Sequence, residues 1–316
     1  MRYLVTGGAG FIGSNTVDEL VRRGHDVAVL DNLSTGKAAN LSQVSSKIKL
    51  IQASVTEPDA VREACRGVDC VIHLAAQTSV PRSVKDPIET DLINVTGTLN
   101  VLIAASEAKV KRVVFASSCA VYGQTSILPI REDAQLAPVS PYGASKQIGE
   151  IYGRVFQELY GIEFVALRYF NVFGPRQDPG SPYSGVLSIF NVALLNGTQP
   201  TVYGDGEQSR DFVYVGNVVE ANLLAAEAKG GAGQIMNIGT GIRSTLNQTL
   251  ALLEKITGRP AKAKYAPARD GDIRDSQADI ALAREALGYH PRVGFEEGLK
   301  KTWEWFSANQ RAASRP

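Results

Sequence analysis

The stretch Tyr3–Gly13, YLVTGGAGFIG, leads from a short apolar run directly into a glycine-rich segment. Its glycines Gly7, Gly10 and Gly13 lie between a run that predicts a strand and a run, Phe11–Val21, that predicts a helix. Glycine permits a tight turn and a close approach of the backbone to a pyrophosphate, and the following helix offers free N–H groups. The stretch therefore predicts a dinucleotide-binding turn. Its GxxGxxG spacing leaves a glycine turn that binds nothing as the alternative.

Further apolar runs follow in the first half of the chain, and amphipathic segments such as Leu92–Ile103 separate them. The runs are nearly continuous in apolar residues, as strands buried on both faces of a sheet must be. They span Val27–Asp31, Ile48–Gln52, Cys70–Ala76, Arg112–Ser118 and Glu163–Tyr169. This alternation predicts an α/β fold with a Rossmann-like, doubly wound parallel sheet that binds ligands at the carboxyl ends of its strands.

The second run ends in Asp31, about 20 residues after the glycine segment, where a carboxylate can bind the 2′-hydroxyl of an adenosine ribose. The same carboxylate would repel a 2′-phosphate, so the sequence favours NAD over NADP. An acidic residue at a strand end can also be a simple turn former, which is the alternative.

The segment Pro141–Lys146, PYGASK, places Tyr142 and Lys146 four residues apart on a predicted helix, and therefore on one face of it. Free tyrosine is a poor base at neutral pH because its pKa lies near 10. A nearby ammonium group and the positive ring of an oxidised nicotinamide would lower that pKa and favour the phenolate. A bare YxxxK pair occurs often by chance, and taken alone it indicates an exposed helix pair.

A serine-rich segment, Phe115–Gly123, follows the fifth apolar run at the edge where such sheets bind ligands. The hydroxyl of Ser118 can hydrogen-bond a reacting oxygen there, although serines at strand ends are also common turn formers. Taken with the glycine turn and Asp31, the set Ser118, Tyr142 and Lys146 predicts coupled hydride and proton transfer.

The composition of the chain changes after about Asn171, where glycine, proline, serine and asparagine cluster and the predicted elements become shorter. We therefore expect a Rossmann domain over residues 1–170 and a smaller α/β substrate-binding domain over 171–215 and 241–316. The intervening segment 216–240 contains a helical and a strand pattern and is expected to return to the Rossmann domain.

Composition excludes several classes of function. The net charge is +1 and the pI is about 7.7, which gives no reason to expect a nucleic acid or a membrane surface as partner. No apolar run is long enough to span a bilayer. The 3 cysteines lack CxxC spacing and the 3 histidines lie far apart. We expect no metal site and a cytoplasmic, reducing location.

Seven segments, spread in order over nearly the whole chain, resemble the extended short-chain dehydrogenase/reductases, and among them the UDP-hexose 4-epimerases. They read TGGAGFIG, DNLSTG, HLAA, SSCAVYG, YGASK, RYFNVFGPRQ and RDFVYV. The resemblance implies tightly held NAD in the Rossmann domain, a UDP-sugar in the smaller domain, and a homodimer.

The resemblance also implies a role for each matching residue. Tyr142 would be the catalytic base, Lys146 would hold the nicotinamide ribose and tune Tyr142, and Ser118 would bind the 4-oxygen of the sugar. The residues implied to hold NAD are Gly7, Gly10, Phe11, Ile12, Asp31, Asn32, Ser34, Thr35, Gly36, Ser54, Val55, Leu74, Ala75, Ala76, Tyr142, Lys146 and Tyr169. Those implied to bind the substrate are Ser118, Tyr142, Asn171, Arg210, Arg269, Asp272 and Ser276. An arginine suits a diphosphate, and a solvated surface charge is the alternative for both arginines.

Two departures from relatives bear on the reaction. Ser54 stands where many relatives carry an acidic residue that contacts adenine, so this contact is altered. Cys119 and Ala120 stand where related dehydratases carry an Asp-Glu pair and related decarboxylases a glutamate. Elimination needs an acid and a base, which these two residues do not supply. The resemblance thus favours C4 epimerisation through a 4-keto sugar; a reductase, a 4,6-dehydratase and an inactive NAD-sensing regulator are the alternatives.

The range of sugars depends on a residue that lines the hexose pocket in the family and is matched by Ser276. This residue is large in enzymes restricted to UDP-glucose and UDP-galactose, and small in those that also take N-acetylated sugars. A serine leaves volume for an acetamido group, so we expect UDP-GlcNAc and UDP-GalNAc to be accepted alongside UDP-glucose and UDP-galactose. The alternative is that other walls of the pocket decide.

Overall fold

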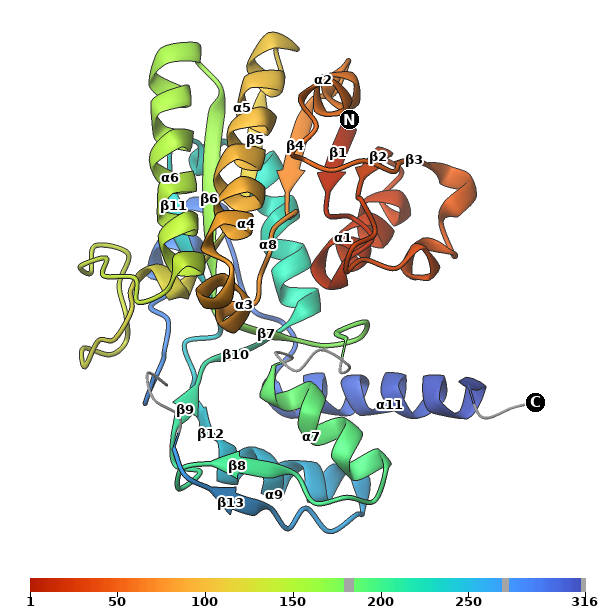
Figure 1. Cartoon of the computed structure of the whole chain (residues 1–316), viewed down its shortest axis with the longest axis vertical. Helices are drawn as coiled ribbons and strands as arrows, with labels where there is room; N and C mark the ends of the chain where they lie inside the picture. The colour runs from red at the N-terminus through yellow and green to blue at the C-terminus, as the bar shows by residue number, and fades with distance from the viewer. Residues whose placement is uncertain (179–184, 269–272, 314–316) are drawn as a thin grey trace.

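Seven parallel strands form the central sheet of the chain, and the computed structural model describes residues 1–178, 185–268 and 273–313 (Figure 1). The strand order is β11-β6-β5-β4-β1-β2-β3. The strands are β1 (Arg2–Thr6), β2 (Asp26–Leu30), β3 (Ile48–Ile51), β4 (Cys70–His73), β5 (Arg112–Ser118), β6 (Glu163–Tyr169) and β11 (Ile235–Ile238). The predicted Rossmann-like sheet is confirmed, although the fourth apolar run leaves the sheet after His73 instead of continuing to Ala76.

The carboxyl ends of the strands meet at one edge of the sheet because all neighbouring pairs are parallel. Thr6 at the end of β1 pairs with Leu30 on one side and with His73 on the other. Farther along, Ser118 at the end of β5 pairs with Tyr169 at the end of β6. The strand order reverses at β1, and in doubly wound sheets a ligand crevice opens at such a point.

Helices cover both faces of the sheet. Successive residues of β1 belong to opposite sides: Tyr3 and Val5 pack in one core cluster and Leu4 in the other. The first face is covered by α1 (Phe11–Arg22), α8 (Val215–Glu227) and α10 (Ala281–Leu287). The second is covered by α2 (Pro58–Cys65), α5 (Gly97–Glu107) and α6 (Pro141–Tyr160). Beside α6 lie α3 (Val80–Lys85), α4 (Pro87–Asp91) and a π-helical turn, Leu92–Thr96.

A second group of elements lies below the sheet in Figure 1 and has its own apolar core. Its helices are α7 (Val186–Leu195), α9 (Leu246–Thr257) and α11 (Phe295–Ala313), and its parallel strand pair is β8 (Thr201–Tyr203) with β13 (Lys264–Ala266). Two strand pairs lead from the sheet to this group: β7 (Asn171–Phe173) with β10 (Phe212–Tyr214), and β9 (Ser209–Arg210) with β12 (Ser244–Thr245). Short 3₁₀ helices span Ala38–Leu41, Ser45–Lys47, Cys119–Val121 and Lys229–Gly231.

One segment beyond residue 240 packs differently from the sequence-based expectation. Ala283 and Leu287 of α10, together with Tyr289, belong to the core cluster of the sheet and not to that of the smaller group. The hydroxyl of Tyr289 donates to the carbonyl oxygen of Gly239 at 2.9 Å. The sheet core therefore includes part of the segment 241–316 that was assigned to the substrate-binding domain.

Within the described residues, the helices are all too short or too polar to cross a lipid bilayer.

Candidate active site

The glycine turn joins β1 to α1 at the point where the strand order reverses. Gly7 has φ +68°, and a Cβ there would lie 2.7 Å from the backbone nitrogen of Ala75. A Cβ on Gly13 would lie 2.1 Å from the carbonyl oxygen of Gly7. Gly10 is the N-cap of α1 and has no side chain to cap the first N–H groups of the helix. Packing therefore excludes a side chain at Gly7 and at Gly13. The first N–H groups of α1 have no side-chain cap and can bind an anion.

Asp31 follows β2 and lies against this turn. Its carboxylate oxygens accept hydrogen bonds from the backbone N–H groups of Ala9 at 2.9 Å and Leu33 at 2.8 Å. A Cβ on Gly36 would lie 2.9 Å from each carboxylate oxygen, so the segment after Asp31 folds closely around it. These contacts show that Asp31 is more than a turn former, because it links the glycine turn to the segment that follows β2.

Leu74, Ala75 and Ala76 follow β4 beside the glycine turn and are all half-buried. Below them a chain of hydrogen bonds fixes His73: Thr6 Oγ1 lies 2.6 Å from its Nδ1, and Thr98 Oγ1 lies 3.0 Å from its Nε2. Because Thr98 donates to the carbonyl oxygen of Asn94, its oxygen accepts from Nε2–H, and Nδ1 accepts from Thr6. Burial lowers the pKa of His73 to about 3, and Lys146 adds to this effect, so the imidazole is neutral.

The other residues predicted to hold NAD lie around the same edge. Asn32, Ser34 and Thr35 are exposed after β2, and Gly36 is buried. Ser54 follows β3, and its hydroxyl lies 2.8 Å from that of Thr56. The side chains of Phe11 and Ile12 are half-buried at the start of α1, while Val55 and Tyr169 are buried. The fold thus gathers all of them at the carboxyl edge, as a dinucleotide requires.

Tyr142 and Lys146 lie in the first turns of α6, which begins after Ser140. The Ser140 hydroxyl caps the helix by accepting from the N–H of Gly143 at 3.1 Å. Farther along the helix, glycines allow close contact with the sheet: a Cβ on Gly149 would lie 2.4 Å from the Phe115 ring. This approach lets Lys146 Nζ donate to the carbonyl oxygen of Ala116 at 2.7 Å. Lys146 is only 4% exposed, which excludes the exposed helix pair.

The acid–base expectation for the pair depends on two positive charges, that of Lys146 and that of an oxidised nicotinamide ring. Burial raises the pKa of Tyr142 to about 12, although a hydrogen bond with Ser118 acts in the lowering direction. Burial lowers the pKa of Lys146 to about 8, and Glu150 opposes this shift. Lys146 Nζ lies 5.9 Å from the centre of the Tyr142 ring. The side chains of the chain alone therefore keep Tyr142 protonated, and the expected lowering requires a further positive charge such as an oxidised nicotinamide.

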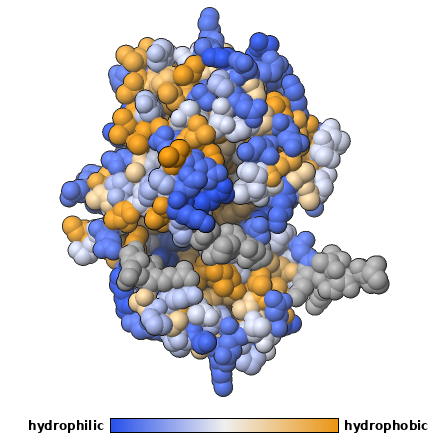
Figure 2. Space-filling model, in the orientation of Figure 1, coloured by the Kyte–Doolittle hydropathy of each residue, from blue (hydrophilic) through white to orange (hydrophobic). Residues whose placement is uncertain are grey.

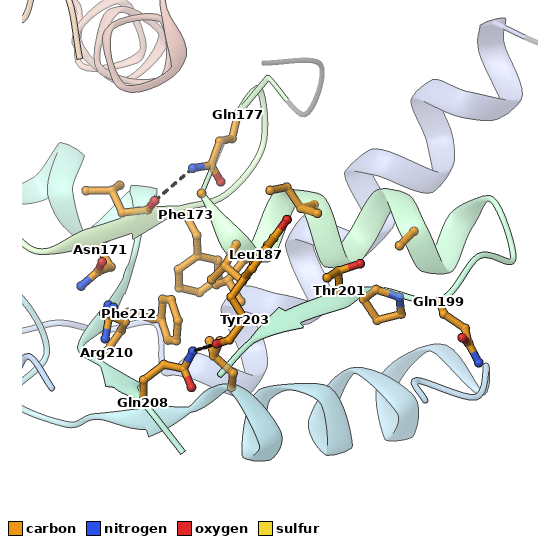
Figure 3. A pocket seen from close by; sticks show the side chains of 17 residues that line it. Asn171, Phe173, Gln177, Leu187, Gln199, Thr201, Tyr203, Gln208, Arg210 and Phe212 are labelled. Carbon is orange, nitrogen blue, oxygen red and sulfur yellow. Dashed lines mark hydrogen bonds between the residues drawn. The ribbon is translucent and has the colours of Figure 1, made fainter. Parts of the chain in front are cut away.

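A cavity of about 510 Å³ lies between the smaller group of elements and the strand pairs that lead to it (Figure 3). Its walls include the aromatic rings of Phe173, Phe212 and Tyr203, and its polar groups include Asn171 and Arg210. The volume is in the range of small-molecule sites, and an apolar wall with a few polar groups is their usual lining. Sequence analysis predicted Asn171 and Arg210 here but assigned no role to the aromatic residues, although Phe173 and Phe212 lie within the segments RYFNVFGPRQ and RDFVYV.

Asn171 connects the cavity with Ser276. Its side-chain amide donates to the hydroxyl of Ser276 at 3.2 Å, and Ser276 is buried. Arg210 Nη1 donates to the carbonyl oxygens of Ser209 at 2.9 Å and Arg274 at 3.1 Å. Arg269 and Asp272, which were predicted to bind the substrate, lie outside the described residues.

The cavity and the Tyr142 region are close enough to interact electrostatically. Burial raises the pKa of Cys119, which follows Ser118, to about 11, while Arg210 acts to lower it. The guanidinium of Arg210 is therefore near enough to the end of β5 for its charge to act on the Cys119 thiol. The structure places Ser118 beside Tyr142, and Asn171 beside Ser276, and it brings both pairs to the carboxyl edge of the sheet.

Several buried residues behind the site were missed by the sequence analysis. Glu150 and Arg168 form an ion pair with side chains 4% exposed each. Asp211, which is fully buried, accepts hydrogen bonds from Thr240, Gly241 and Ala278. The position of Glu150, four residues after Lys146, was a usable signal because it places both side chains on one helix face. The partners of Asp211 come from distant segments and have no such signal.

The described residues contain no group of three or more His, Cys, Asp or Glu side chains that could hold a metal ion.

The fold and the arrangement of the site residues agree with comparisons against known proteins. Residues 3–239 match the model of the NAD dependent epimerase/dehydratase family. A UDP-glucose 4-epimerase from Mycolicibacterium smegmatis is 41% identical over 310 residues, which cover 97% of this chain and 98% of the relative. A UDP-glucose 4-epimerase from Thermotoga maritima, solved with UDP-glucose, has a TM-score of 0.94 and 41% identity and covers 98% of this chain and 100% of its own.

A third similar protein was solved with a different sugar nucleotide bound. The UDP-N-acetylglucosamine 4-epimerase from Methanobrevibacter ruminantium, in complex with UDP-N-acetylmuramic acid, has a TM-score of 0.94 and 40% identity, and 98% of each chain is covered. The glycine turn and Asp31 fit the cofactor that the family name specifies, which is NAD. Its sequence match and its fold together show that the chain belongs to the NAD dependent epimerase/dehydratase family.

Proposed function

We propose that the protein is a UDP-sugar 4-epimerase that interconverts the two C4 epimers of a UDP-hexose. The observation that carries this proposal is the placement of Ser118 beside Tyr142, with Lys146 buried one helical turn farther along, at the edge of the sheet that the cavity adjoins. The relatives described above, a UDP-glucose and a UDP-N-acetylglucosamine 4-epimerase, support the same reaction class.

The cavity would hold the nucleotide part of the substrate. Its aromatic and aliphatic wall suits a uracil ring, and Arg210 with Asn171 suits the charged diphosphate. The sugar would then extend toward Ser118 and Tyr142, which agrees with the electrostatic effect of Arg210 on Cys119. Arg269 and Asp272 stay predicted as additional ligands of the UDP.

In the proposed mechanism, the Ser118 hydroxyl hydrogen-bonds the 4-oxygen of the sugar, and Tyr142 accepts the proton of the 4-hydroxyl group. NAD, when bound at the glycine turn and Asp31, supplies the chemistry of hydride removal and return at C4. Lys146 contributes positive charge close to the phenol and so favours the phenolate. In the second half of the reaction, Tyr142 returns the proton to the oxygen.

Inversion at C4 requires that the oxidised sugar present its other face before it is reduced. In the proposed binding mode, Arg210 and Asn171 hold the diphosphate, and the aromatic wall of the cavity holds the uracil. The UDP group is therefore fixed, and the sugar would turn about the bond that links it to the diphosphate. The cofactor would thus be regenerated in every cycle, in contrast to a reductase, which consumes its reduced cofactor.

Elimination and decarboxylation need a further acid or base close to the sugar. Cys119 and Ala120 follow Ser118 in a short 3₁₀ helix, and burial raises the pKa of the Cys119 thiol to about 11. A neutral thiol and a methyl group do not supply this chemistry. This supports an epimerase over a 4,6-dehydratase, while the intact Tyr142–Lys146 pair disfavours an inactive NAD-sensing regulator.

For the sugar range, we propose that both acetylated and non-acetylated hexoses are accepted. Ser276 is small, 5% exposed and hydrogen-bonded to Asn171, which lines the cavity. A small residue beside Asn171 leaves more volume for an acetamido group than a tyrosine would.

A homodimer is proposed from an apolar surface on the helices beside the site. Ile88 of α4 is 81% exposed, Leu159 of α6 is 69% exposed, and Val84 of α3 is 63% exposed. These helices pack against one another, and Figure 2 shows apolar side chains at the edge where α6 lies in Figure 1. Large exposed apolar surfaces of this kind are typical of subunit interfaces. We also propose a cytoplasmic location, which agrees with three free thiols.

The test of the proposed function is incubation of the purified protein with UDP-glucose or UDP-GlcNAc without added cofactor, followed by NMR of the products. We expect the C4 epimer of each sugar nucleotide to form. Turnover only with added reduced cofactor would indicate a reductase, and loss of water from the sugar would indicate a dehydratase. Either result would overturn the proposal.

A further inference from the structure

Three residues at the end of β5 each form a hydrogen bond with a residue in the first half of α6. Ser118 hydrogen-bonds Tyr142, the carbonyl oxygen of Ala116 accepts from Lys146 at 2.7 Å, and the Ser117 hydroxyl donates to Glu150 Oε1 at 2.5 Å. The three helix residues stand four apart and therefore share one face. Glu150 thus completes a series of contacts whose first two members are the proposed catalytic pair.

Glu150 is also held from the neighbouring strand. Arg168 of β6 donates to it twice, from Nε at 2.8 Å and from Nη2 at 2.7 Å. The second terminal nitrogen of Arg168 donates to the hydroxyl of Tyr122 at 2.8 Å and to the carbonyl oxygen of Glu132 at 3.1 Å. Since Ser117 and Arg168 are direct partners in the sheet, Glu150 binds two adjacent strands at once.

Two buried cations and one buried carboxylate are grouped in this region. Lys146 and Arg168 are the cations; Glu150 is paired with Arg168 and acts on Lys146, four residues before it on α6, through its charge. The other groups around Lys146 are the neutral imidazole of His73 from β4, the ring of Phe115 from β5 and the phenol of Tyr142 from its own helix. Glu132 lies beyond Arg168, and burial raises the pKa of its carboxyl group.

We propose that Glu150 is a positioning residue for the Tyr142–Lys146 pair: it docks α6 on the ends of β5 and β6 and supplies the negative charge that keeps buried Lys146 in its ammonium form. A buried ammonium group without a compensating charge loses its proton at lower pH. Lys146 would then no longer favour the Tyr142 phenolate. The inference rests on the proposed function only where activity is the readout.

The test follows the titration of Lys146 directly, by NMR of protein with isotope-labelled lysine side chains, with Lys146→Arg to assign the signal. In Glu150→Gln we expect the midpoint of the Lys146 titration to move to a lower pH by about 1 unit. The alkaline limb of kcat should move by the same amount, so that kcat falls about 5-fold at pH 8 and hardly at all at pH 6. Titration of Lys146 does not depend on the substrate, so failure of the proposed function is distinguishable from failure of this inference.

Glu150→Gln leaves Arg168 buried without its partner, so a second variant separates charge from folding. Glu150→Gln/Arg168→Gln restores the net charge of the cluster while it removes the ion pair. If charge is the cause, the midpoint of Lys146 returns to within about 0.5 unit of the original value. If docking alone mattered, the midpoint would be the same in all three proteins, and the proposal would be overturned.

The matched control is Glu163→Gln at the opposite end of the same two strands. Glu163 accepts from Arg112 Nε at 2.8 Å, and Arg112 is buried. This variant breaks a similar pair far from the carboxyl edge. We expect a lower melting temperature and no change in the titration of Lys146. A shift as large as that of Glu150→Gln would show that any lost ion pair perturbs Lys146, and it would refute a specific role for Glu150.

Discussion

The two ends of the site are each held in place by a buried carboxylate, but in different ways. Glu150, behind the Tyr142 end, is paired with Arg168 and binds two strands that are neighbours in the sheet. Asp211, behind the Arg210 end, accepts from three backbone N–H groups and a hydroxyl, which belong to Thr240, Gly241 and Ala278. The Tyr142 end is therefore built on regular structure and charge pairing, whereas the Arg210 end is built on loops and backbone donors.

This difference suggests a division of tasks. Proton transfer needs a fixed geometry and a controlled charge, which adjacent strands and a packed helix supply. Selection among sugars needs a wall that can vary without disturbing the reaction, and loops joined through Asp211 supply it. The two ends should accordingly respond separately to mutation, and the predictions below test this in order of decreasing effect.

The largest effect is expected for Tyr142→Phe. The variant lacks the group that would exchange a proton with the 4-oxygen, so kcat should fall by about 10²–10⁴-fold. Binding of UDP, measured by calorimetry, should be unchanged because the cavity belongs to the other end. A variant that keeps more than about a tenth of the original kcat would contradict the assignment of the base.

Asp211→Asn should be next. An amide in place of the carboxylate leaves some of the four donors without an acceptor, and each buried unsatisfied group costs about 1–3 kcal/mol. We expect a loss of about 2–3 kcal/mol in the free energy of unfolding. Denaturant unfolding measures the stability. UDP binding should weaken while the titration of Lys146 stays the same; a change in Lys146 would mean that the two ends are not separate.

Ser276→Tyr should change the sugar range by a smaller amount. A bulky ring beside Asn171 should lower kcat/KM for UDP-GlcNAc relative to UDP-glucose by about 10–100-fold, or about 1–3 kcal/mol. Kinetics with both sugar nucleotides are the measurement, and Ser276→Ala is the control that removes the hydroxyl but keeps the volume. Equal losses on both sugars would show that other walls decide.

The smallest effect is expected for Thr240→Val. It removes the hydroxyl that donates to Asp211 at 2.7 Å and keeps the backbone donor at 2.8 Å. The free energy of unfolding should fall by about 1 kcal/mol, with kcat unchanged. A loss as large as that of Asp211→Asn would indicate that the hydroxyl, and not the backbone groups, dominates the binding of this carboxylate.

Sequence reasoning was most successful where the signal was local. The strand before Gly7 and the helix after it agree with the predicted turn. It was less informative for electrostatics, since the YxxxK spacing indicates groups that would lower the pKa of Tyr142 but not the burial that raises it to about 12. Burial depends on everything that surrounds a side chain, and the spacing of two residues does not contain that information.

The sequence by itself determined the class of sheet, the place of the dinucleotide turn and the shared helix face of Tyr142 and Lys146, because each follows from residues close together in the chain. Only the tertiary structure decided which distant residues support that pair. The contacts of Glu150 with Arg168, and of Asp211 with Gly241 and Ala278, join segments that are neighbours in space alone. A polar side chain becomes an anchor when folding removes water from around it, and only the complete fold specifies where that happens.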